Sequence, residues 1–313
     1  MPPSSPAPES DANAGRDEPR TALVTGANSG IGLALSTALA TRGWRVFLHG
    51  RDAEKLGRAK RKVSKAGEAR TFKADLADLE QVRRLAERVQ EATGRLDALV
   101  NNAGLVVSSC RLTPQRIETT MAVNAVAPWA LFDALRPLMA STAEAHGEAR
   151  LVNVTSAAHR GGRFVPPEAS GDAEALAAAL REPPRGYNAI KAYSQSKMAI
   201  TAWTLEAARR LEGTGVTANC VHPGVVRTGI FPGLGGAGGF FATLFSVFYL
   251  PPSAGARGPL MLAADPAWRG RTGRFVTRGH FRGPHEAEPP EQARDPAWGA
   301  AAYDAMRLLA VTE

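Results

Sequence analysis

The chain has 313 residues, of which 44% are hydrophobic, and it carries a net charge of +8 at neutral pH. This length and apolar content suit one large α/β domain of about 250 residues with tails. Two cysteines, Cys110 and Cys220, do not make a disulfide framework or a metal site. The basic residues are scattered and come without a recognition motif, so we expect no nucleic-acid partner.

Neither the N-terminal 19 residues nor the most apolar segment has the pattern of a signal peptide or a membrane span. Residues 1–19 are rich in Pro, Ser, Ala and acids and lack the apolar core of a signal peptide, which predicts a disordered leader. The best candidate for an apolar membrane segment, Phe240–Leu250, is too short to cross a bilayer. We therefore expect a cytoplasmic protein with no membrane span.

From Arg20 onward, short apolar runs alternate with longer amphipathic ones. Continuous apolar runs are typical of parallel strands that are buried on both faces, so the alternation predicts a Rossmann-type, doubly wound α/β sheet. We expect about seven parallel strands in a single domain over residues 20–281, and a C-terminal extension with a helix over residues 282–313. Strands are predicted at 22–25, 45–49, 69–74, 98–100, 151–155, 217–221 and 275–277. Helices are predicted at 31–42, 53–66, 79–92, 117–139, 194–211 and 254–264.

Two irregular segments, residues 157–187 and 229–250, interrupt the alternation of strands and helices. Both leave the carboxyl end of a predicted strand, the edge at which such sheets bind ligands. The second is rich in glycine and in aromatic side chains that are costly to leave in water. We interpret residues 229–250 as an insertion on the substrate side, the alternative being a variable surface loop.

A glycine-rich turn, Thr-Gly-Ala-Asn-Ser-Gly-Ile-Gly at residues 25–32, joins the first strand to the first helix. Glycines permit a tight turn and a close approach to a pyrophosphate, and the helix N-terminus offers free N–H groups. The candidate cofactor-binding residues here are Gly26, Asn28, Ser29, Gly30, Ile31 and Gly32.

The spacing Gly-x-x-x-Gly-x-Gly of this turn resembles that of the short-chain dehydrogenase/reductase family, whose members bind a nicotinamide dinucleotide. The second strand ends in Gly50-Arg51-Asp52, where an NAD site requires a carboxylate at the position of Gly50. The Arg51 guanidinium can instead pair with a 2′-phosphate, and Asp52 is placed to cap the next helix. We therefore predict NADP(H) as the cofactor.

Further cofactor contacts are implied by the resemblance at the ends of later strands. Asp75 and Leu76 close the third strand, where the family's acid contacts the adenine. Asn101-Asn102-Ala103-Gly104 matches the family's NNAG motif, which lies beside the cofactor ribose. A Pro-Gly turn after the sixth strand is placed by the nicotinamide. The implied contacts from these motifs are Asn102, Ala103, Gly104, Pro223, Gly224, Val226 and Thr228.

Tyr193 and Lys197 form the family's YxxxK pair. Positions i and i+4 share one helix face, so the ammonium lies near the phenol and should lower its pKa toward a useful range. The resemblance assigns hydride transfer to the cofactor, polarisation of the substrate oxygen to Ser156 and proton exchange to Tyr193. It also assigns a ribose contact to Tyr193 and Lys197, and Asn124 matches the asparagine that holds a water leading to the lysine.

The stretches around residues 152–159 and 187–213 resemble the retinol dehydrogenase group of this family, which acts on lipophilic aldehydes and alcohols. We therefore predict an oxidoreductase that interconverts a small lipophilic carbonyl compound and its alcohol. Two alternatives stay open, a natural-product ketoreductase and a non-catalytic NADP(H)-binding regulatory or scaffold protein. The resemblance also implies a possible homodimer through the helices at 117–139 and 194–211.

Overall fold

A computed structural model describes residues 18–158, 171–181, 186–226, 250–279 and 282–311 of the chain. Its centre is an eight-stranded sheet in the order β3-β2-β1-β4-β5-β6-β7-β8, in which the first seven strands are parallel and β8 is antiparallel to β7. The strands are β1 (Thr21–Val24), β2 (Arg45–Gly50), β3 (Ala69–Lys73), β4 (Ala98–Asn101), β5 (Ala149–Val154), β6 (Val216–His222), β7 (Phe275–Arg278) and β8 (Pro284–Ala287). The predicted doubly wound α/β sheet in a single domain is confirmed.

Helices cover both faces of the sheet, as its fully buried strands require. One apolar core lies under α1, α2 and α10, and the other lies under α3, α5, α7 and α12. Helices run over α1 (Gly30–Ala40), α2 (Ala53–Val63), α3 (Leu79–Ala92), α4 (Thr119–Met121), α5 (Ala127–His146), α6 (Ala173–Arg181), α7 (Ala189–Arg210), α9 (Pro252–Gly255), α10 (Arg257–Ala264), α11 (Glu291–Arg294) and α12 (Pro296–Ala310).

The helix predicted at 117–139 is instead three consecutive segments. A short α4 passes into a π-helical turn at Ala122–Val126, and α5 then continues to His146. Pro128 in the first turn of α5 has no N–H to donate, which is compatible with the change of helical pitch just before it. The helix ends at Gly147, whose φ of 88° allows the left-handed cap.

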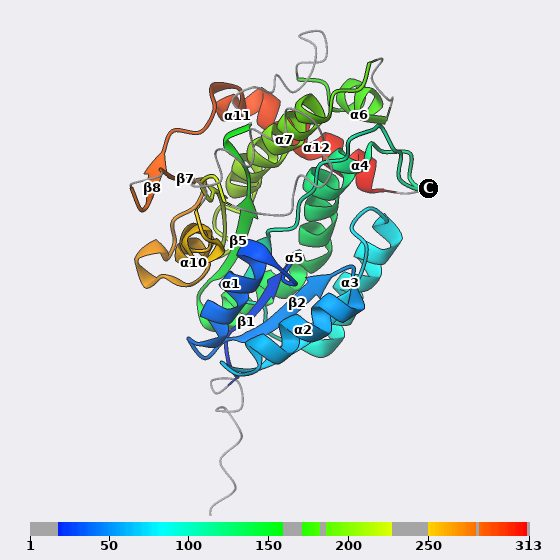
Figure 1. The fold of residues 1–313 in the computed structure, drawn as a ribbon. Coiled ribbons are helices and arrows are strands. Elements are labelled where there is room, and N and C mark those ends of the chain that lie inside the picture. The colour runs from blue at the N-terminus through cyan, green and yellow to red at the C-terminus, as the bar shows by residue number, and fades with distance from the viewer. Residues whose placement is uncertain (1–17, 159–170, 182–185, 227–249, 280–281, 312–313) are drawn as a thin grey trace, which may run out of the picture.

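The C-terminal segment completes the fold. After β8 has joined the edge of the sheet, α12 packs against α7, α6 and α5, and Figure 1 shows α12 in red lying beside α7 in green. From Ala192 to Ala208, every α7 residue except the half-buried Gln195 is buried. The possible homodimer stays a prediction. Because this stretch of α7 is already buried within one chain, it is not available for a dimer interface.

The parallel strands place their carboxyl ends, and therefore the sequence motifs, at one edge of the sheet. Strands β1 and β4 are neighbours at the middle of the sheet. From β1 the chain continues to β2 on one side, and from β4 it continues to β5 on the other side, so the boundary between β1 and β4 is the topological switch point. Within the described residues, no helix is both long and apolar enough to span a bilayer. The predicted leader lies almost wholly outside the described residues, as does the 229–250 insertion apart from Leu250.

Candidate active site

The glycine-rich turn between β1 and α1 has the shape that its glycines predict. Gly26 and Gly30 have φ values of 65° and 53°, in the left-handed region that favours glycine. A Cβ on Gly32 would lie 2.4 Å from the carbonyl oxygen of Gly26, so only glycine fits there. Ser29 is the N-cap of α1, and its side chain makes no capping hydrogen bond. The first N–H groups of α1 are therefore available to donate hydrogen bonds to an anion.

The NNAG motif at the end of β4 is bonded directly to this loop. The Thr25 hydroxyl accepts hydrogen bonds from the backbone N–H groups of Asn102 (2.9 Å) and Ala103 (3.0 Å). The Asn102 side-chain amide donates to the carbonyl oxygen of Thr25 at 2.9 Å. The two motifs that sequence analysis assigned to the cofactor thus form one rigid unit across the switch point.

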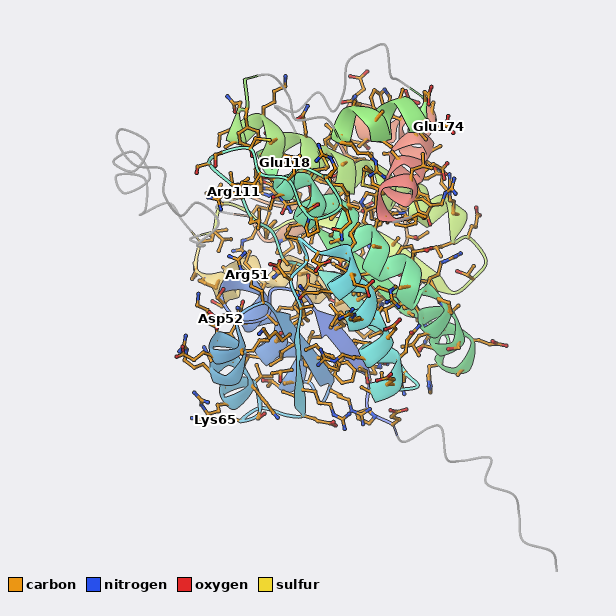
Figure 2. The ribbon with its side chains drawn as sticks, turned by 90° about the vertical axis from the view of Figure 1, so that its right-hand side faces the viewer. Arg51, Asp52, Lys65, Arg111, Glu118 and Glu174 are labelled. Atoms are coloured by element: carbon orange, nitrogen blue, oxygen red, sulfur yellow. The ribbon has the colours of Figure 1, made fainter. Side chains whose placement is uncertain are left out.

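The end of β2 carries the residues expected to select the dinucleotide. A Cβ on Gly50 would lie 3.2 Å from the side chain of Asn28, so the glycine-rich turn itself crowds the position where an NAD site carries its acid. Asp52 caps α2 by accepting a hydrogen bond from the Lys55 N–H, as predicted. Arg51 is exposed and pairs with no acid among the described residues, and Figure 2 shows it beside Asp52 where α2 begins.

The remaining cofactor candidates lie along the same edge. Asp75 accepts a hydrogen bond from the Ala77 N–H at 3.0 Å, while Leu76 is buried in the core. Gly224, after Pro223 at the end of β6, has a φ of 86°. Val226 and Ile31 both pack against Gly255, so the Pro-Gly turn meets the start of α1. Thr228 lies outside the described residues.

Ser156 and Tyr193 meet at the carboxyl end of β5. Tyr193 is buried with 6% of its surface exposed, and its side chain is hydrogen-bonded to Ser156. Burial raises the pKa of the Tyr193 phenol, and the hydrogen bond with Ser156 acts in the opposite direction. The net direction is therefore opposite to the predicted lowering, with burial as its largest cause. The phenol is therefore protonated at neutral pH.

Lys197 lies one helical turn from Tyr193, with its Nζ 5.8 Å from the centre of the Tyr193 ring. The ammonium donates a hydrogen bond to the carbonyl oxygen of Val154 at 3.0 Å. Its side chain is fully enclosed, and this burial lowers the pKa of Lys197 to about 8. A Cβ on Gly104 would lie 3.4 Å from this Nζ, so the lysine also adjoins the NNAG motif.

Asn124 lies in the π-helical turn and is completely buried. Its amide oxygen accepts a hydrogen bond from the Leu105 N–H, and its amide nitrogen donates to the Leu105 carbonyl and to the Ser196 hydroxyl, all at 2.9 to 3.0 Å. Ser196 in turn donates to the carbonyl of Tyr193. The structure thus brings Asn124, Ser156, Tyr193 and Lys197 together and gives Asn124 an anchoring role between β4 and α7.

Sequence analysis missed two residues that organise this site, Thr25 and Ser196. Thr25 begins the glycine motif, but its hydroxyl matters only because β4 lies beside β1 in the folded sheet. Ser196 lies between the two members of the YxxxK pair and joins Tyr193 to Asn124. In the sequence, each of them is only a hydroxyl residue inside a motif, and the motif does not show which group the hydroxyl will bond.

The model of the family "short chain dehydrogenase" matches residues 20–167 and 184–235 of this chain, which is more than half of it. The chain is a short-chain dehydrogenase/reductase. Within this family it is similar to the retinol dehydrogenases. Human retinol dehydrogenase 13 is 33% identical over 88% of this chain and 81% of its own length. The "Putative daunorubicin C-13 ketoreductase DnrU" of Streptomyces sp. (strain C5) is 37% identical over 82% of this chain and 83% of its own length.

Solved structures share the fold of this dehydrogenase. A crystal structure of an uncharacterized protein from Mycobacterium paratuberculosis is 29% identical, with a TM-score of 0.73 over 94% of this chain and 96% of that one. The RhlG/NADP active-site complex of Pseudomonas aeruginosa is 25% identical, with a TM-score of 0.64 over 84% of this chain and 95% of that one. The chain is accordingly an oxidoreductase of the family that uses a nicotinamide cofactor.

Proposed function

We propose that this dehydrogenase interconverts a lipophilic aldehyde or ketone and its alcohol with NADP(H), and that Tyr193 is its proton donor and acceptor. The observation that carries the proposal is the group formed by the half-buried Ser156 with the buried Tyr193 and Lys197, beside Gly104. Tyr193 and Lys197 are both buried at the ligand-binding edge of the sheet and both have a perturbed pKa, and such perturbed groups gather at functional sites.

The described residues fit a phosphorylated dinucleotide. The uncapped start of α1 and the tight Gly26–Gly32 turn suit a pyrophosphate. The exposed Arg51, which pairs with no acid in the described part of the chain, offers its guanidinium to a 2′-phosphate, and Gly50 offers no carboxylate that would repel it. The RhlG complex with NADP, which shares the fold, also supports this choice. When bound, the cofactor supplies or accepts the hydride.

The side chains of the enzyme would handle the substrate oxygen and its proton. In the reducing direction, Ser156 donates a hydrogen bond to the carbonyl oxygen and stabilises the charge that develops on it. Tyr193, protonated because burial raises its pKa, gives its proton to that oxygen. Lys197 is still mainly charged at neutral pH and would stabilise the phenolate that remains. Asn124 holds α7 against the end of β4 through Ser196, which keeps the phenol in place.

The substrate class rests on the relatives. One relative is named as a retinol dehydrogenase and the other as a daunorubicin C-13 ketoreductase, so the names denote an alcohol and a ketone as the reacting groups. The similarity to the second protein keeps a natural-product ketoreductase as the alternative. The predicted cytoplasmic location stays a prediction.

The proposal is tested by measuring NADPH binding and then NADPH oxidation with a panel of carbonyl compounds. The panel contains short and long aliphatic aldehydes, retinal and polycyclic ketones. We expect oxidation that increases with the apolar surface of the substrate. Preference for polycyclic ketones over aldehydes would favour the ketoreductase, while tight NADPH binding without oxidation by any compound would favour the scaffold protein.

A further inference from the structure

A buried carboxylate, Glu118, lies at the end of the loop that connects β4 to α4. Only 7% of its surface is exposed, and no lysine or arginine among the described residues forms an ion pair with it. Its Oε1 accepts a hydrogen bond from the Thr120 N–H and its Oε2 accepts one from the Met121 N–H, both at 2.9 Å. Burying a charge is costly, so a carboxylate that depends on hydrogen bonds alone needs all of its donors.

The third donor to Glu118 is Tyr187, which lies just before α7. The Tyr187 hydroxyl is 3.1 Å from Oε1 of Glu118, 3.1 Å from the carbonyl oxygen of Val107 and 3.4 Å from the Thr120 hydroxyl. The phenol therefore has two acceptors for one proton. Burial and the nearby carboxylate raise the pKa of Tyr187 to about 12, although the Thr120 hydroxyl acts the other way, so Tyr187 remains a donor.

These contacts join two segments that are distant in sequence. Val107 and Glu118 both belong to the loop over residues 105–118, which Glu118 ends as the N-cap of α4, and Tyr187 adjoins Asn188, the N-cap of α7. The same loop is held at its other end by Asn124, which bonds both backbone groups of Leu105. Figure 2 shows Arg111 and Glu118 on the side of the molecule where Arg51 and Asp52 lie.

Both attachments connect the 105–118 loop to helices that carry the active-site residues. The π-helical turn with Asn124 follows α4 directly, and Tyr193 lies in the second turn of α7. The loop itself leaves the carboxyl end of β4, next to the strand that leads to Ser156. Ligands of such sheets bind outside these strand ends, so the position of the loop limits how a substrate can reach Tyr193.

We propose that Glu118 and Tyr187 are positioning residues that fix the 105–118 loop as one wall of the carbonyl-substrate site. This inference rests on the proposed function, because the wall has a catalytic consequence only if a carbonyl compound is reduced beside Tyr193. The pair touches neither the reacting atoms nor the candidate cofactor residues. Its loss should therefore impair the use of the substrate while leaving the binding of NADPH intact.

The first measurement follows the loop without any turnover. Cys110 lies on the loop and is half-buried, whereas Cys220 is fully buried in β6. The rate at which Ellman's reagent labels Cys110 in the folded protein therefore reports opening of the loop. We expect Tyr187→Phe to raise this rate at least fivefold. The control is Tyr303→Phe, which removes the hydroxyl of a buried tyrosine on α12 and should leave the rate unchanged.

The second measurement compares KM and kcat for decanal and propanal in Tyr187→Phe, Glu118→Gln and Tyr303→Phe, with the Kd of NADPH determined in parallel. We expect the first two variants to raise KM for decanal at least fivefold, to change KM for propanal less, and to leave the Kd of NADPH within twofold. An unchanged Cys110 rate would refute the attachment of the loop. A faster rate with unchanged KM would refute its role in positioning. A wild-type enzyme that reduces neither aldehyde, nor any other carbonyl compound, would refute the proposed function instead.

Discussion

The replacement Lys197→Met should make the protein more stable and at the same time inactive. Lys197 is fully enclosed, and its pKa falls from 10.5 to about 8 because burial disfavours the ammonium. Since one pKa unit corresponds to about 1.4 kcal/mol, keeping the ammonium protonated at pH 7 costs the folded state on the order of 3 kcal/mol. The substitution also loses the hydrogen bond to the carbonyl of Val154, worth about 1 kcal/mol. A net gain of about 2 kcal/mol remains.

The pH dependence of this gain follows from the direction of the shift. A lowered lysine pKa means that folding favours the neutral amine, so the cost is full below pH 8 and disappears as the pH rises toward 10.5. Urea unfolding of wild type and Lys197→Met at pH 6 to 10 measures the difference in the free energy of unfolding. We expect the variant to be more stable at pH 7 and its advantage to shrink above pH 8. Equal stability at pH 7, or a difference that does not change with pH, would refute the reasoning.

Three further substitutions test the cofactor site and the packing. Arg51→Ala should weaken NADPH binding at least tenfold and NADH binding less than twofold. The control Arg61→Ala makes the same charge change on α2 and should alter the binding of neither cofactor. Equal weakening of both cofactors by Arg51→Ala would exclude a 2′-phosphate contact. Gly32→Ala places a Cβ 2.4 Å from a backbone oxygen and should lower both Tm and NADPH affinity, while Gly94→Ala, with nothing within 4 Å, should do neither. Met306→Ala empties a fully buried position on α12 and should lower the free energy of unfolding by about 2 to 5 kcal/mol in urea titrations; a cost below 0.5 kcal/mol would show that α12 does not pack as described.

The sequence was most informative where one local signal determined the structure. Buried strands such as β4 contain continuous apolar runs, and their alternation with helices predicted the doubly wound sheet correctly. The edge strand β8 was missed because Pro284–Ala287 is short, has no apolar run and is incompletely buried, and it forms a strand through its pairing with β7. The start of α7 was predicted five residues too late, although Asn188 supplies an N-cap.

The candidate site was predicted as a set of residues, and the interactions among them were not. Spacing correctly put Tyr193 and Lys197 on one helix face, but the direction of the Tyr193 pKa shift depends on burial, which arises only in the folded chain. Similarly, Asn124 could be matched to a motif, whereas its bonds to Leu105 and Ser196 require contacts between three elements. Burial by elements that are distant in sequence cannot be predicted from a local sequence pattern.

The most direct test of the proposed function is the replacement Tyr193→Phe, which removes one hydroxyl from the centre of the site. NADPH oxidation with the best carbonyl substrate and NADPH binding are measured in the same preparations, together with the remote Tyr303→Phe control. We predict that turnover falls about 100-fold or more, as expected for the loss of a positioned proton donor. The Kd of NADPH should stay within twofold of the wild-type value. Turnover within tenfold of wild type would contradict the assignment of Tyr193 as the proton donor.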